Sequence, residues 1–584
     1  MSITSVPVEK TAGTPPVPLR LRVGVILDSL TVPRWMHELL TLLEHAPVAE
    51  LALIASVSEN RAGSCPLPVS PRRPLLFELW RRLDHRLFQR RLMKPETFTP
   101  VSFTPRREHA EVLKCTARSI DGNVELDPRD IERVRVADLD VLLNFSEVTP
   151  NVALYHSARF GIWSFDDDKY LLDTLFWKVF DYSLVIEDGI NISLSRRDTM
   201  RLPCSCSSVD NLLLSRNTSN LCSKRSTILL QCLSDLEQHG WQHLQSSLKP
   251  RPVLSRNAPG NVDTARLLLR LAFRAVRQQS RRRFFHEQWF IAFRKRSICE
   301  QSGREGSDFT ILRAPSDRFY ADPFVIDRGE KSYVFFEDYS FHKGKGVISY
   351  VEIDPVHGCS SPEIVLEEPY HLSYPCIFEW QGDIYLLPET KNNKTVQLYR
   401  ASDFPRGWQL AHVLLEGVAA VDSTVLHHNS KFWLFTSGIG TSDPWFDGKA
   451  ELFLYYSDSL SGPWTPHKQN PIVSDIRRCR PAGHVFSADG QLFRPGQDYS
   501  AADSYAVTLN LIDVLSETEY HETSVARIPP TWISDNLGTH TFNRSDRYEV
   551  LDGRTLITPL SRRSSRPVFE TITPVRPLIE NVAQ

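Results

Sequence analysis

Polar residues recur at one spacing in the C-terminal half of the chain. Each opens a short apolar stretch, and a second polar residue closes the next apolar stretch 15 positions later. The pairs are Asp322 and Glu337, Tyr374 and Glu389, and Asp422 and Ser437. Carboxylates that converge can exchange protons with a substrate, which is the chemistry of glycosidic-bond cleavage. With aromatic side chains beside them, they also suit the binding of a polyhydroxylated ligand.

The repeat predicts a β-propeller. Repeats of roughly 40–50 residues with several short strands each indicate one blade per repeat. The fourth unit is less regular, because its 15-residue spacing runs from Ala482 to Gln497, and the fifth is shorter and ends at Asp552. We expect a five-bladed β-propeller over residues 306–560. Its units open at Asp322, Tyr374, Asp422, Arg480 and His540, which are 52, 48, 58 and 60 residues apart.

The innermost strand of each blade lines a central channel, so the five opening residues are expected to be neighbours there. Within this channel we predict that Asp322, Asp422 and Glu389 are catalytic. The closing residues lie on second strands, where we expect an outer ring of Glu337, Asp338, Glu389, Gln497 and Asp498. The residues predicted to bind substrate are Glu337, Asp338, His371, Tyr374, Arg480, Arg494, Gln497, Asp498 and His540. We predict no metal, because no second His lies at ligand spacing from His540, and no cofactor.

Each of these residues also has a structural interpretation. An Asp before Pro at the start of a strand, such as Asp322, often caps a turn. Glu389 follows Pro388 and is open to a role as a salt-bridged blade residue. The polar cluster around Arg480 and Arg494 either binds an anionic or hydroxylated group or links the fourth and fifth blades.

The N-terminal half predicts an open α/β sheet. The stretches 21–29 and 49–57 read as buried strands, and residues 33–43 between them have helical periodicity. No G-x-G-x-x-G follows the first strand, so a dinucleotide site of that type is not expected. We expect residues 1–20 to be a disordered, Pro-rich tail and residues 561–584 to be a C-terminal tail.

Three motifs in this half resemble bacterial hybrid proteins related to sugar and folate-dependent formyltransferases. The motifs are LDVLLN (139–144), ARFGIWSF (158–165) and FWKV (176–179). The resemblance implies a Rossmann-like formyltransferase-type α/β domain over residues 21–230. Family chemistry uses a His and an Asp near the formyl group, but Asp166-Asp167-Asp168-Lys169 follows Phe165 and the His is missing. The domain is therefore expected to be degenerate, with His156 as a substitute base or a helix-end residue, and the Asp triplet as a solvated loop or a cation site.

A basic segment separates the two halves. Residues 231–305 are expected to form a helical linker, and residues 251–296 contain 12 Lys plus Arg against 2 Asp plus Glu. From residue 264 to 296, apolar residues alternate with arginines. This pattern predicts either an amphipathic helix in peripheral contact with an anionic membrane or polyanion, or an interdomain helix whose apolar stripe is packed.

The overall composition narrows the class of protein. The chain has 584 residues and a net charge of −2, which argues against nucleic acid as a partner. No apolar run approaches the roughly 18–20 residues that cross a bilayer, and the N-terminus has no apolar core of a signal peptide. Ten cysteines are scattered along the chain, and we expect reduced thiols and a cytoplasmic location.

The C-terminal half also carries motifs that identify a family resemblance. YADPF, FFEDY, HLSYP, YLLPET, VDST, RPAG, RPGQD and GTHT are similar to the N-terminal propeller module of plant glucosamine inositolphosphorylceramide transferases. That module is similar in turn to the propellers of glycoside hydrolase family 43. The resemblance implies that Asp322 is a general base and Asp422 a residue that tunes pKa. Where those hydrolases have the Glu that acts as the general acid, this chain has Arg480, so Glu389 or Glu337 is left for the role of general acid.

Three functions follow from these observations. The leading one is a carbohydrate-active protein whose propeller binds a glycan or glycoconjugate and cleaves or transfers a glycosyl group. The second is a non-catalytic sugar-binding platform in polysaccharide or glycolipid biosynthesis. The third is an amino-sugar N-formyltransferase.

Overall fold

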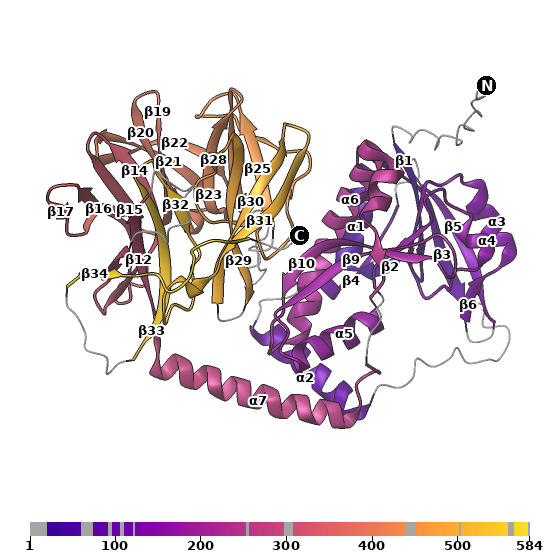
Figure 1. The fold of residues 1–584 in the computed structure, drawn as a ribbon. Coiled ribbons are helices and arrows are strands. Elements are labelled where there is room, and N and C mark those ends of the chain that lie inside the picture. Colours follow the sequence, from indigo (N-terminus) through magenta and orange to yellow (C-terminus); the bar gives the residue numbers. More distant parts are fainter. Residues whose placement is uncertain are drawn as a thin grey trace, which may run out of the picture. The chain divides into compact units, whose positions relative to one another are not determined.

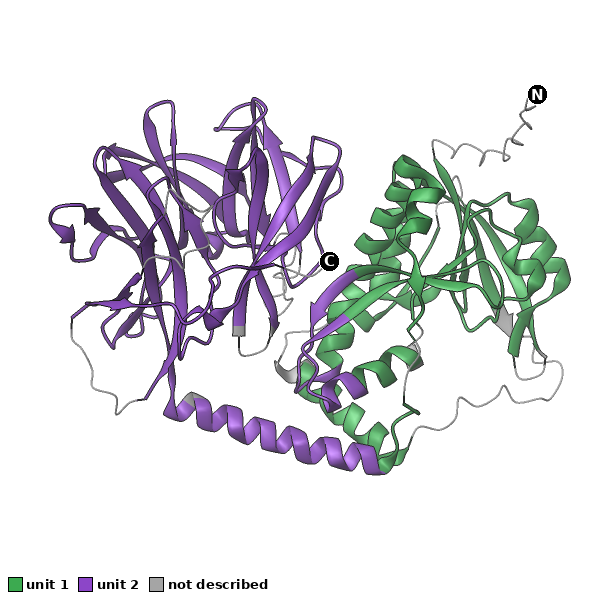
Figure 2. Ribbon diagram, in the orientation of Figure 1, with its two compact units in different colours: residues 1–176, 187–204, 215–261 green, residues 177–186, 205–214, 262–584 purple. Residues whose placement is uncertain are grey.

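The structure is a computed structural model of the whole chain. It describes residues 20–59, 74–91, 96–105, 110–120, 123–166, 168–252, 256–296, 308–438, 451–501, 504–558 and 566–581. The chain divides into two compact units, which Figure 2 colours separately. Unit 1 contains residues 1–176, 187–204 and 215–261, and unit 2 contains residues 177–186, 205–214 and 262–584.

The first unit is built on a mixed nine-stranded sheet in the order β11-β10-β9-β8-β7-β1-β3-β5-β6. Its central strands β3, β1, β7 and β8 are parallel, and β6 and β9 run antiparallel to their neighbours. The strands are β1 (Leu21–Leu27), β3 (Ala49–Glu59), β5 (Glu111–Ile120), β6 (Asn123–Leu126), β7 (Val141–Phe145), β8 (Ile162–Ser164), β9 (Val185–Ser193), β10 (Thr199–Ser208) and β11 (Lys249–Pro250); a separate pair is β2 (Thr31–Pro33) with β4 (Pro100–Ser102). The prediction of an α/β domain is confirmed at this level.

The helices that accompany this sheet are mostly amphipathic. They are α1 (Arg34–His45), α2 (Leu75–Arg91), α3 (Pro128–Val136), α4 (Val152–Tyr155), α5 (Asp168–Phe180) and α6 (Leu214–Ser246), and a 3-10 turn spans Glu96–Phe98. The expected boundary between domain and linker at residue 230 falls inside α6, which differs from the prediction. Side chains of α6 such as Leu221, Leu229 and Leu236 are buried in turn after turn. A helix with so much buried surface lacks the one-sided pattern that identifies a surface helix.

The second unit contains five antiparallel sheets, one for each blade of a β-propeller (Figure 1). Blade one has β14 (Arg318–Arg328), β15 (Lys331–Ser340), β16 (Lys345–Asp354), β17 (Gly358–Cys359) and β18 (Glu363–Leu366); blade two has β19 (Ser373–Trp380), β20 (Asp383–Glu389), β21 (Thr395–Asp403) and β22 (Arg406–Glu416); blade three has β23 (Val421–His428), β24 (Lys431–Ser437), β25 (Leu452–Ser457) and β26 (Thr465–Pro466). Blade four has β27 (Arg480–Pro481), β28 (Phe486–Ala488), β29 (Gln491–Ala501), β30 (Ser504–Leu515), β31 (Tyr520–Ile528) and β35 (Glu580–Asn581). The predicted five-bladed propeller is confirmed.

Blade five joins strands from both ends of the propeller sequence. Its strands are β32 (Phe542–Arg544), β33 (Tyr548–Ile557), β12 (His286–Lys295), β13 (Phe309–Arg313) and β34 (Val568–Ile572). β12 pairs with β33 over ten residue pairs, from His286–Ile557 to Lys295–Tyr548. The stretch 286–295, expected as part of a helical linker, is therefore a strand, and the expected tail contributes β34 and β35. Residues 289–293 of β12 are all buried, against a partner more than 250 residues away, and this long-range effect was not visible in the basic composition of the segment.

Helix α7 (Asn261–Phe284) precedes β12, and it confirms a helix in the basic segment. Among the described residues, no helix is long and apolar enough to cross a membrane. The cytoplasmic location stays a prediction.

Candidate functional site

The opening residues of the first three blades share an unusual backbone conformation. Asp322, Tyr374 and Asp422 have φ values of 52°, 45° and 52°. Each lies where the register between the first and second strand of its blade shifts, as in a β-bulge. A left-handed conformation in residues other than Gly costs about 1–3 kcal/mol and is concentrated at functional sites. The 15-residue repeat seen in the sequence is thus a repeated bulge, and it turns these residues toward the propeller centre.

Carboxylates fasten each bulge to the preceding blade. The backbone N–H of Asp322 donates to Asp552 Oδ2 at 3.3 Å, and that of Tyr374 donates to Asp322 Oδ2 at 3.3 Å. The N–H of Asp422 donates to Glu389 Oε2 at 3.2 Å. Three consecutive blade junctions therefore use the same contact, in which a buried carboxylate accepts from the strained residue of the next blade.

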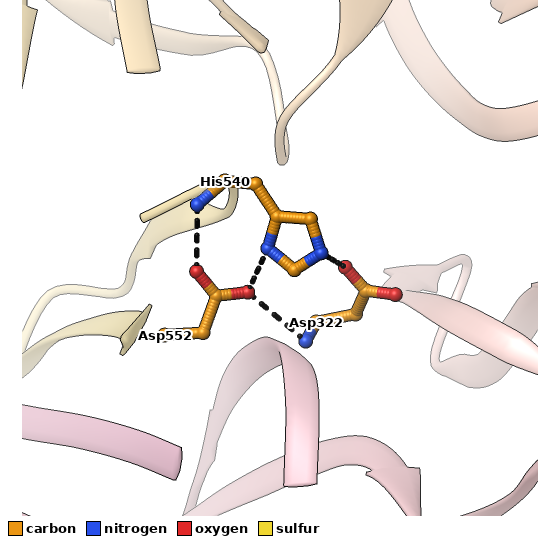
Figure 3. Close-up of side chains that lie close together, drawn as sticks. All are labelled: Asp322, His540 and Asp552. Atoms are coloured by element: carbon orange, nitrogen blue, oxygen red, sulfur yellow. Dashed lines mark hydrogen bonds and ion pairs between the residues drawn. The ribbon is translucent and has the colours of Figure 1, made fainter. Parts of the chain in front are cut away.

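His540 lies between two carboxylates, as Figure 3 shows. Its Nδ1 contacts Asp552 Oδ2, and its Nε2 lies 3.4 Å from Asp322 Oδ1. Asp552 Oδ1 also accepts from the backbone N–H of His540 at 2.8 Å, and the hydroxyl of Thr541 donates to Asp322 Oδ1 at 2.9 Å. The indole of Trp289 on β12 stacks on the imidazole with ring centroids 4.1 Å apart. The imidazole is held in one orientation on both edges and on one face.

The charges of this trio shift one another's pKa. Burial raises the pKa of Asp322 to about 6 against the lowering effect of His540, and the charges of Asp422 and Asp552 add to the rise. Burial lowers the pKa of His540, but the carboxylates of Asp552 and Asp322 raise it by more. At neutral pH this places an ionised Asp322 beside an imidazolium.

Asp422 is the second carboxylate at the centre and is 1% exposed. Its Oδ2 accepts from Arg480 Nε and, at 2.6 Å, from Gln497 Nε2. Arg480 Nη1 also donates to the hydroxyl of Tyr499 at 2.8 Å. Asp422 Oδ1 is buried and, among the described residues, no N–H or hydroxyl group donates to it. The carboxyl group of Glu389 hydrogen-bonds the Asp422 side chain, so a protonated Glu389 shares its proton with Asp422.

Two glutamates complete the centre, and both favour the protonated form. Burial and the charge of Asp422 raise the pKa of Glu389 to about 8, although Arg480 opposes the shift. Burial, with Asp322, Glu389 and Asp422 nearby, raises the pKa of Glu337 well above its ordinary value. His371 Nε2 lies 3.7 Å from Glu337 Oε1, and burial lowers the pKa of this His.

The arrangement of the closing residues differs from the expected outer ring. Glu337, Glu389 and Gln497 lie on second strands, yet they reach the same charge cluster as Asp322 and Asp422. The reason is the bulge: in blades one and two the closing residue pairs with the residue just before the bulge, as in Ala321–Glu337 and Ser373–Glu389. Opening and closing residues therefore form one cluster.

Four of the sequence-predicted binding residues make contacts elsewhere. Asp338 pairs with Arg318 at 3.2 Å, Asp498 with Arg527 at 3.1 Å and Arg494 with Glu522 at 2.6 Å. Asp338 and Asp498 are each one position from a central residue, and successive side chains on a strand point to opposite faces. The hydroxyl of Tyr374 accepts from the N–H of Gly483 at 2.6 Å, so its ring serves the contact with blade four.

The sequence reasoning missed Asp552, Trp289 and Tyr499 as members of this site. Asp552 was visible as the end of the fifth unit, but its spacing of 12 from His540 departs from the repeat. Trp289 lies before the predicted propeller, on the strand that closes blade five. Tyr499 lies two positions after Gln497 and therefore on the same face of the strand. This two-residue spacing was the feature of the sequence that could have placed Tyr499 in the site.

The trio in Figure 3 is also the group of side chains most suited to a cation among the described residues. One ligand atom from each of Asp322, His540 and Asp552 lies within 4.8 Å of the others. The same two imidazole nitrogens make the ion-pair contacts with Asp552 and Asp322. The prediction that the site uses no metal stays a prediction.

The first unit has a different kind of cluster, around Asp166. Asp166 accepts from Arg201 Nη1 at 2.8 Å, from Asn191 Nδ2 at 2.9 Å and from Arg251 Nη2 at 3.3 Å. His156 is exposed at the C-terminal end of α4, as in its structural interpretation. Asp167 lies outside the described residues.

The fold and this site define a five-bladed β-propeller with a strongly acidic centre. Residues 308–558 match the family described as "Glucosamine inositolphosphorylceramide transferase 1, N-terminal". The resemblance to that N-terminal module is therefore confirmed for the propeller.

The curated relatives are transferases of the same name. The chain is 38% identical to glucosamine inositolphosphorylceramide transferase 1 of Arabidopsis thaliana over 224 residues, which is 38% of this chain and 28% of the relative. It is 36% identical to the protein of Oryza sativa subsp. japonica over 210 residues, covering 35% of this chain and 28% of the relative. The chain thus spans less than a third of the length of these relatives.

Solved structures with a similar arrangement are glycoside hydrolases. A thermostable family-43 glycoside hydrolase matches with a TM-score of 0.29 and 14% identity, over 38% of this chain and 91% of that chain. The catalytic domain of the Coprinopsis cinerea GH62 alpha-L-arabinofuranosidase matches with a TM-score of 0.32 and 14% identity, over 44% of this chain and 90% of that chain.

Proposed function

We propose that the propeller centre binds a glycan or glycoconjugate and cleaves or transfers one of its glycosyl groups. The observation that carries this proposal is the pair Asp322 and Glu389, which lie in one charge cluster with pKa values of about 6 and about 8. Near pH 7 one carboxyl is then ionised while the other is protonated. Carboxyl groups separated in this way can take the roles of general base and general acid.

In the proposed mechanism the two carboxyls move one proton each. Glu389 donates its proton to the oxygen of the leaving group as the glycosidic bond breaks. Asp322 accepts a proton from the attacking water or acceptor hydroxyl as the new bond to the anomeric carbon forms. His540, oriented by Asp552, keeps Asp322 ionised and able to accept that proton.

Asp422 and Arg480 are proposed to hold the sugar. Asp422 Oδ2 is fixed by Arg480 and Gln497, and Oδ1 would accept from a hydroxyl group of the sugar. Arg480 remains cationic: burial lowers its pKa, but Asp422, Tyr499 and Glu389 together raise it by more. A fixed cation beside the carboxylates would attract an anionic substituent such as a phosphate.

The names of the relatives suggest the substrates to test. They are called glucosamine inositolphosphorylceramide transferases, and the match to them covers the propeller. We therefore propose a glycoconjugate with an amino sugar or an inositol phosphate headgroup as the substrate class.

Replacing Asp322 by Asn tests catalysis directly. We expect turnover of any cleaved member of a panel of glycosides and inositol phosphate glycolipids to fall by about 10²–10⁴-fold. Asn keeps an acceptor for the Tyr374 N–H, so the blade contact is retained. Asp513→Asn is the matched control, because Asp513 lies on β30 with an exposed His521 as its partner. Equal rates for wild type and Asp322→Asn on every cleaved substrate would exclude this role.

A second function is favoured by the blade contacts themselves. Asp322, Glu389 and Asp552 each accept from a backbone N–H of a neighbouring blade, which is a structural use of the same oxygens. A propeller that only binds sugar, as a platform for polysaccharide or glycolipid assembly, would use the centre in this way. Glycan binding without turnover, unchanged by Asp322→Asn, would favour the platform over the enzyme.

The formyltransferase-type identity of the first unit is a further proposal, supported by its parallel β3-β1-β7-β8 core. Amino-sugar N-formylation would need a group that polarises the formyl carbonyl. The carboxyl group of Asp166 is occupied by arginines. Absence of formylated product from formyl-tetrahydrofolate and amino-sugar nucleotides would exclude this activity.

A further inference from the structure

Helix α7 exposes large apolar side chains along one face. Leu269, Phe273 and Val276 are 74%, 70% and 65% exposed, and Val262 and Phe284 are 63% and 58% exposed. At 100° per residue these five side chains lie within a stripe about 80° wide. Isolated exposed apolar residues are ordinary, but a contiguous set on one helix marks an interaction surface.

The opposite face of α7 is already in use. Thr264 and Leu267 are fully buried. Arg274 Nη1 donates to the carbonyl of Val179 at 2.7 Å, and the guanidinium of Arg270 lies 4.0 Å from the ring centroid of Phe180. These contacts lie within unit 2, and they fix which side of the helix faces outward.

Arginines border the exposed stripe. Arg266 and Arg277 lie on one edge of it by helical spacing and Arg283 on the other, and all three are exposed. Among the described residues, the ion pairs of this helix include Arg281 with Glu287 at 3.8 Å but none with Arg266 or Arg277. Long side chains at such positions can bury their methylene groups beside apolar neighbours while the guanidinium stays in a polar layer.

The stripe continues into an apolar hollow at the C-terminal end of α7. A cavity of about 480 Å³ lies between the end of the helix and the propeller. Its lining residues are Arg277, Ser280, Arg281, Phe284, Phe285, Leu537 and Leu556. An apolar hollow with Arg277 and Arg281 among its lining residues fits a hydrocarbon chain attached to a phosphate.

We propose that this face of α7 lies on an anionic phospholipid surface, with the apolar stripe in the acyl boundary and the arginines at the phosphates. Helices with a basic polar region and a Phe- and Leu-rich face bind bilayers in this orientation. Arg266, Arg277 and Arg283 provide the charge complementarity to anionic headgroups. A nucleic acid or another soluble polyanion would use the arginines but would leave Leu269, Phe273 and Val276 in water. This inference is independent of the reaction proposed for the propeller.

Vesicle co-sedimentation of the full chain tests the proposal. Vesicles of phosphatidylcholine with phosphatidylserine are compared with vesicles of phosphatidylcholine alone, at low and high salt. We expect binding to the anionic vesicles, weakened by salt because the arginine contribution is screened. No turnover is measured, so failure here is distinct from failure of the glycan site.

Two sets of variants separate the apolar and the charged contributions. Phe273→Glu and the pair Arg266→Glu with Arg277→Glu should each weaken vesicle binding by about ten-fold or more. All three positions are exposed, so the fold is not at risk. Val136→Glu on α3 is the matched control for Phe273→Glu, because the two side chains are 74% and 70% exposed. Arg129→Glu on α3 is the control for the arginines.

Three outcomes would overturn the proposal. The first is no binding of the wild type to anionic vesicles. The second is binding that depends on the arginines but not on Phe273, which would indicate a soluble polyanion. The third is a dimer in solution that Phe273→Glu dissociates while vesicle binding is absent, which would show that a second copy covers this face.

Discussion

Each unit buries a cluster of carboxylates and cations, but the balance of charge differs. In unit 1, the two carboxylates of Asp166 and Asp188 form ion pairs with three guanidinium groups. The cations are Arg201, Arg225 and Arg251. In the propeller centre, five carboxylates share two cations, and burial favours the neutral form of the neighbouring His371. The carboxylates are those of Asp322, Glu337, Glu389, Asp422 and Asp552, and the cations are Arg480 and His540.

A third cluster, formed by Glu522 and Arg494, shows that a buried carboxyl group can still have a lowered pKa. Glu522 is buried in the same propeller, but Arg494 holds it with two contacts of 2.6 and 2.7 Å. Burial raises the pKa of Glu522, and Arg494 lowers it by more, so the pKa falls below its ordinary value. Glu389 is comparably buried and its pKa rises to about 8. The excess of carboxylates over cations therefore separates a reactive centre from a structural ion pair.

The largest effect is expected from Glu389→Gln. The amide keeps an acceptor for the Asp422 N–H but cannot donate the proton, so turnover should fall by about 10²–10⁴-fold and the alkaline limb of the pH profile should disappear. The measurement is kcat and kcat/KM against pH on a substrate found with the Asp322 panel. Asp498→Asn is the matched variant, because Asp498 pairs with Arg527 and is not in the centre. An unchanged alkaline limb in Glu389→Gln would exclude it as the acid.

In unit 1, removing one charged side chain from the cluster should reduce stability and not turnover. Arg201→Met leaves the buried Asp166 and Asp188 without their shared guanidinium, which we expect to lower the free energy of unfolding by about 3–5 kcal/mol. Arg135→Met is the control, because both members of its pair with Glu132 are exposed and such a pair contributes little to stability. Denaturant unfolding, followed in parallel with turnover, measures both. Lost turnover in Arg201→Met with unfolding unchanged would contradict the division into structural and reactive clusters.

The repeat made much of the propeller predictable from the sequence. A 15-residue register at Asp322, Tyr374 and Asp422 is a local signal, and it corresponds to a backbone bulge that each blade forms by itself. The ring closure was not predictable, because β12 and β34 find their partners only through pairing across more than 250 residues. For this reason the sequence pattern did not place Trp289 in the site.

The sequence predicted which residues lie in the site better than it predicted what each of them does there. Strand alternation explains the errors: Glu337 and Gln497 face the centre, and the neighbours Asp338 and Asp498 face away. Sequence spacing located the pairs but could not select which residue of each pair faces inward. The raised pKa values of Glu337 and Glu389 depend on burial and on charges brought together from several blades, which no local pattern contains.

A smaller effect concerns stability against pH. The pKa of Glu389 is raised in the folded state, so its proton stabilises the fold at low pH and this stability is lost as the pH rises toward about 8. The free energy of unfolding should therefore fall between pH 5 and pH 9, and Glu389→Gln should remove roughly 2 kcal/mol of that fall. Urea unfolding at the two pH values measures it, with the exposed Glu416→Gln as control. If the free energy of unfolding falls by the same amount in the wild type and in Glu389→Gln, the Glu389 carboxyl does not hold its proton in the folded state.

The smallest effect tests the contact in Figure 3. The cation of His540 lowers the pKa of Asp322, so His540→Gln should raise that pKa above about 6. A general base must be ionised, and the acidic limb of kcat/KM should therefore move to higher pH by about one unit, while the alkaline limb stays. His521→Gln is the matched control, because His521 is exposed on Asp513 and outside the centre. An acidic limb that stays in place in His540→Gln would mean that the base is another carboxylate of the cluster, whose ionisation does not depend on this imidazolium.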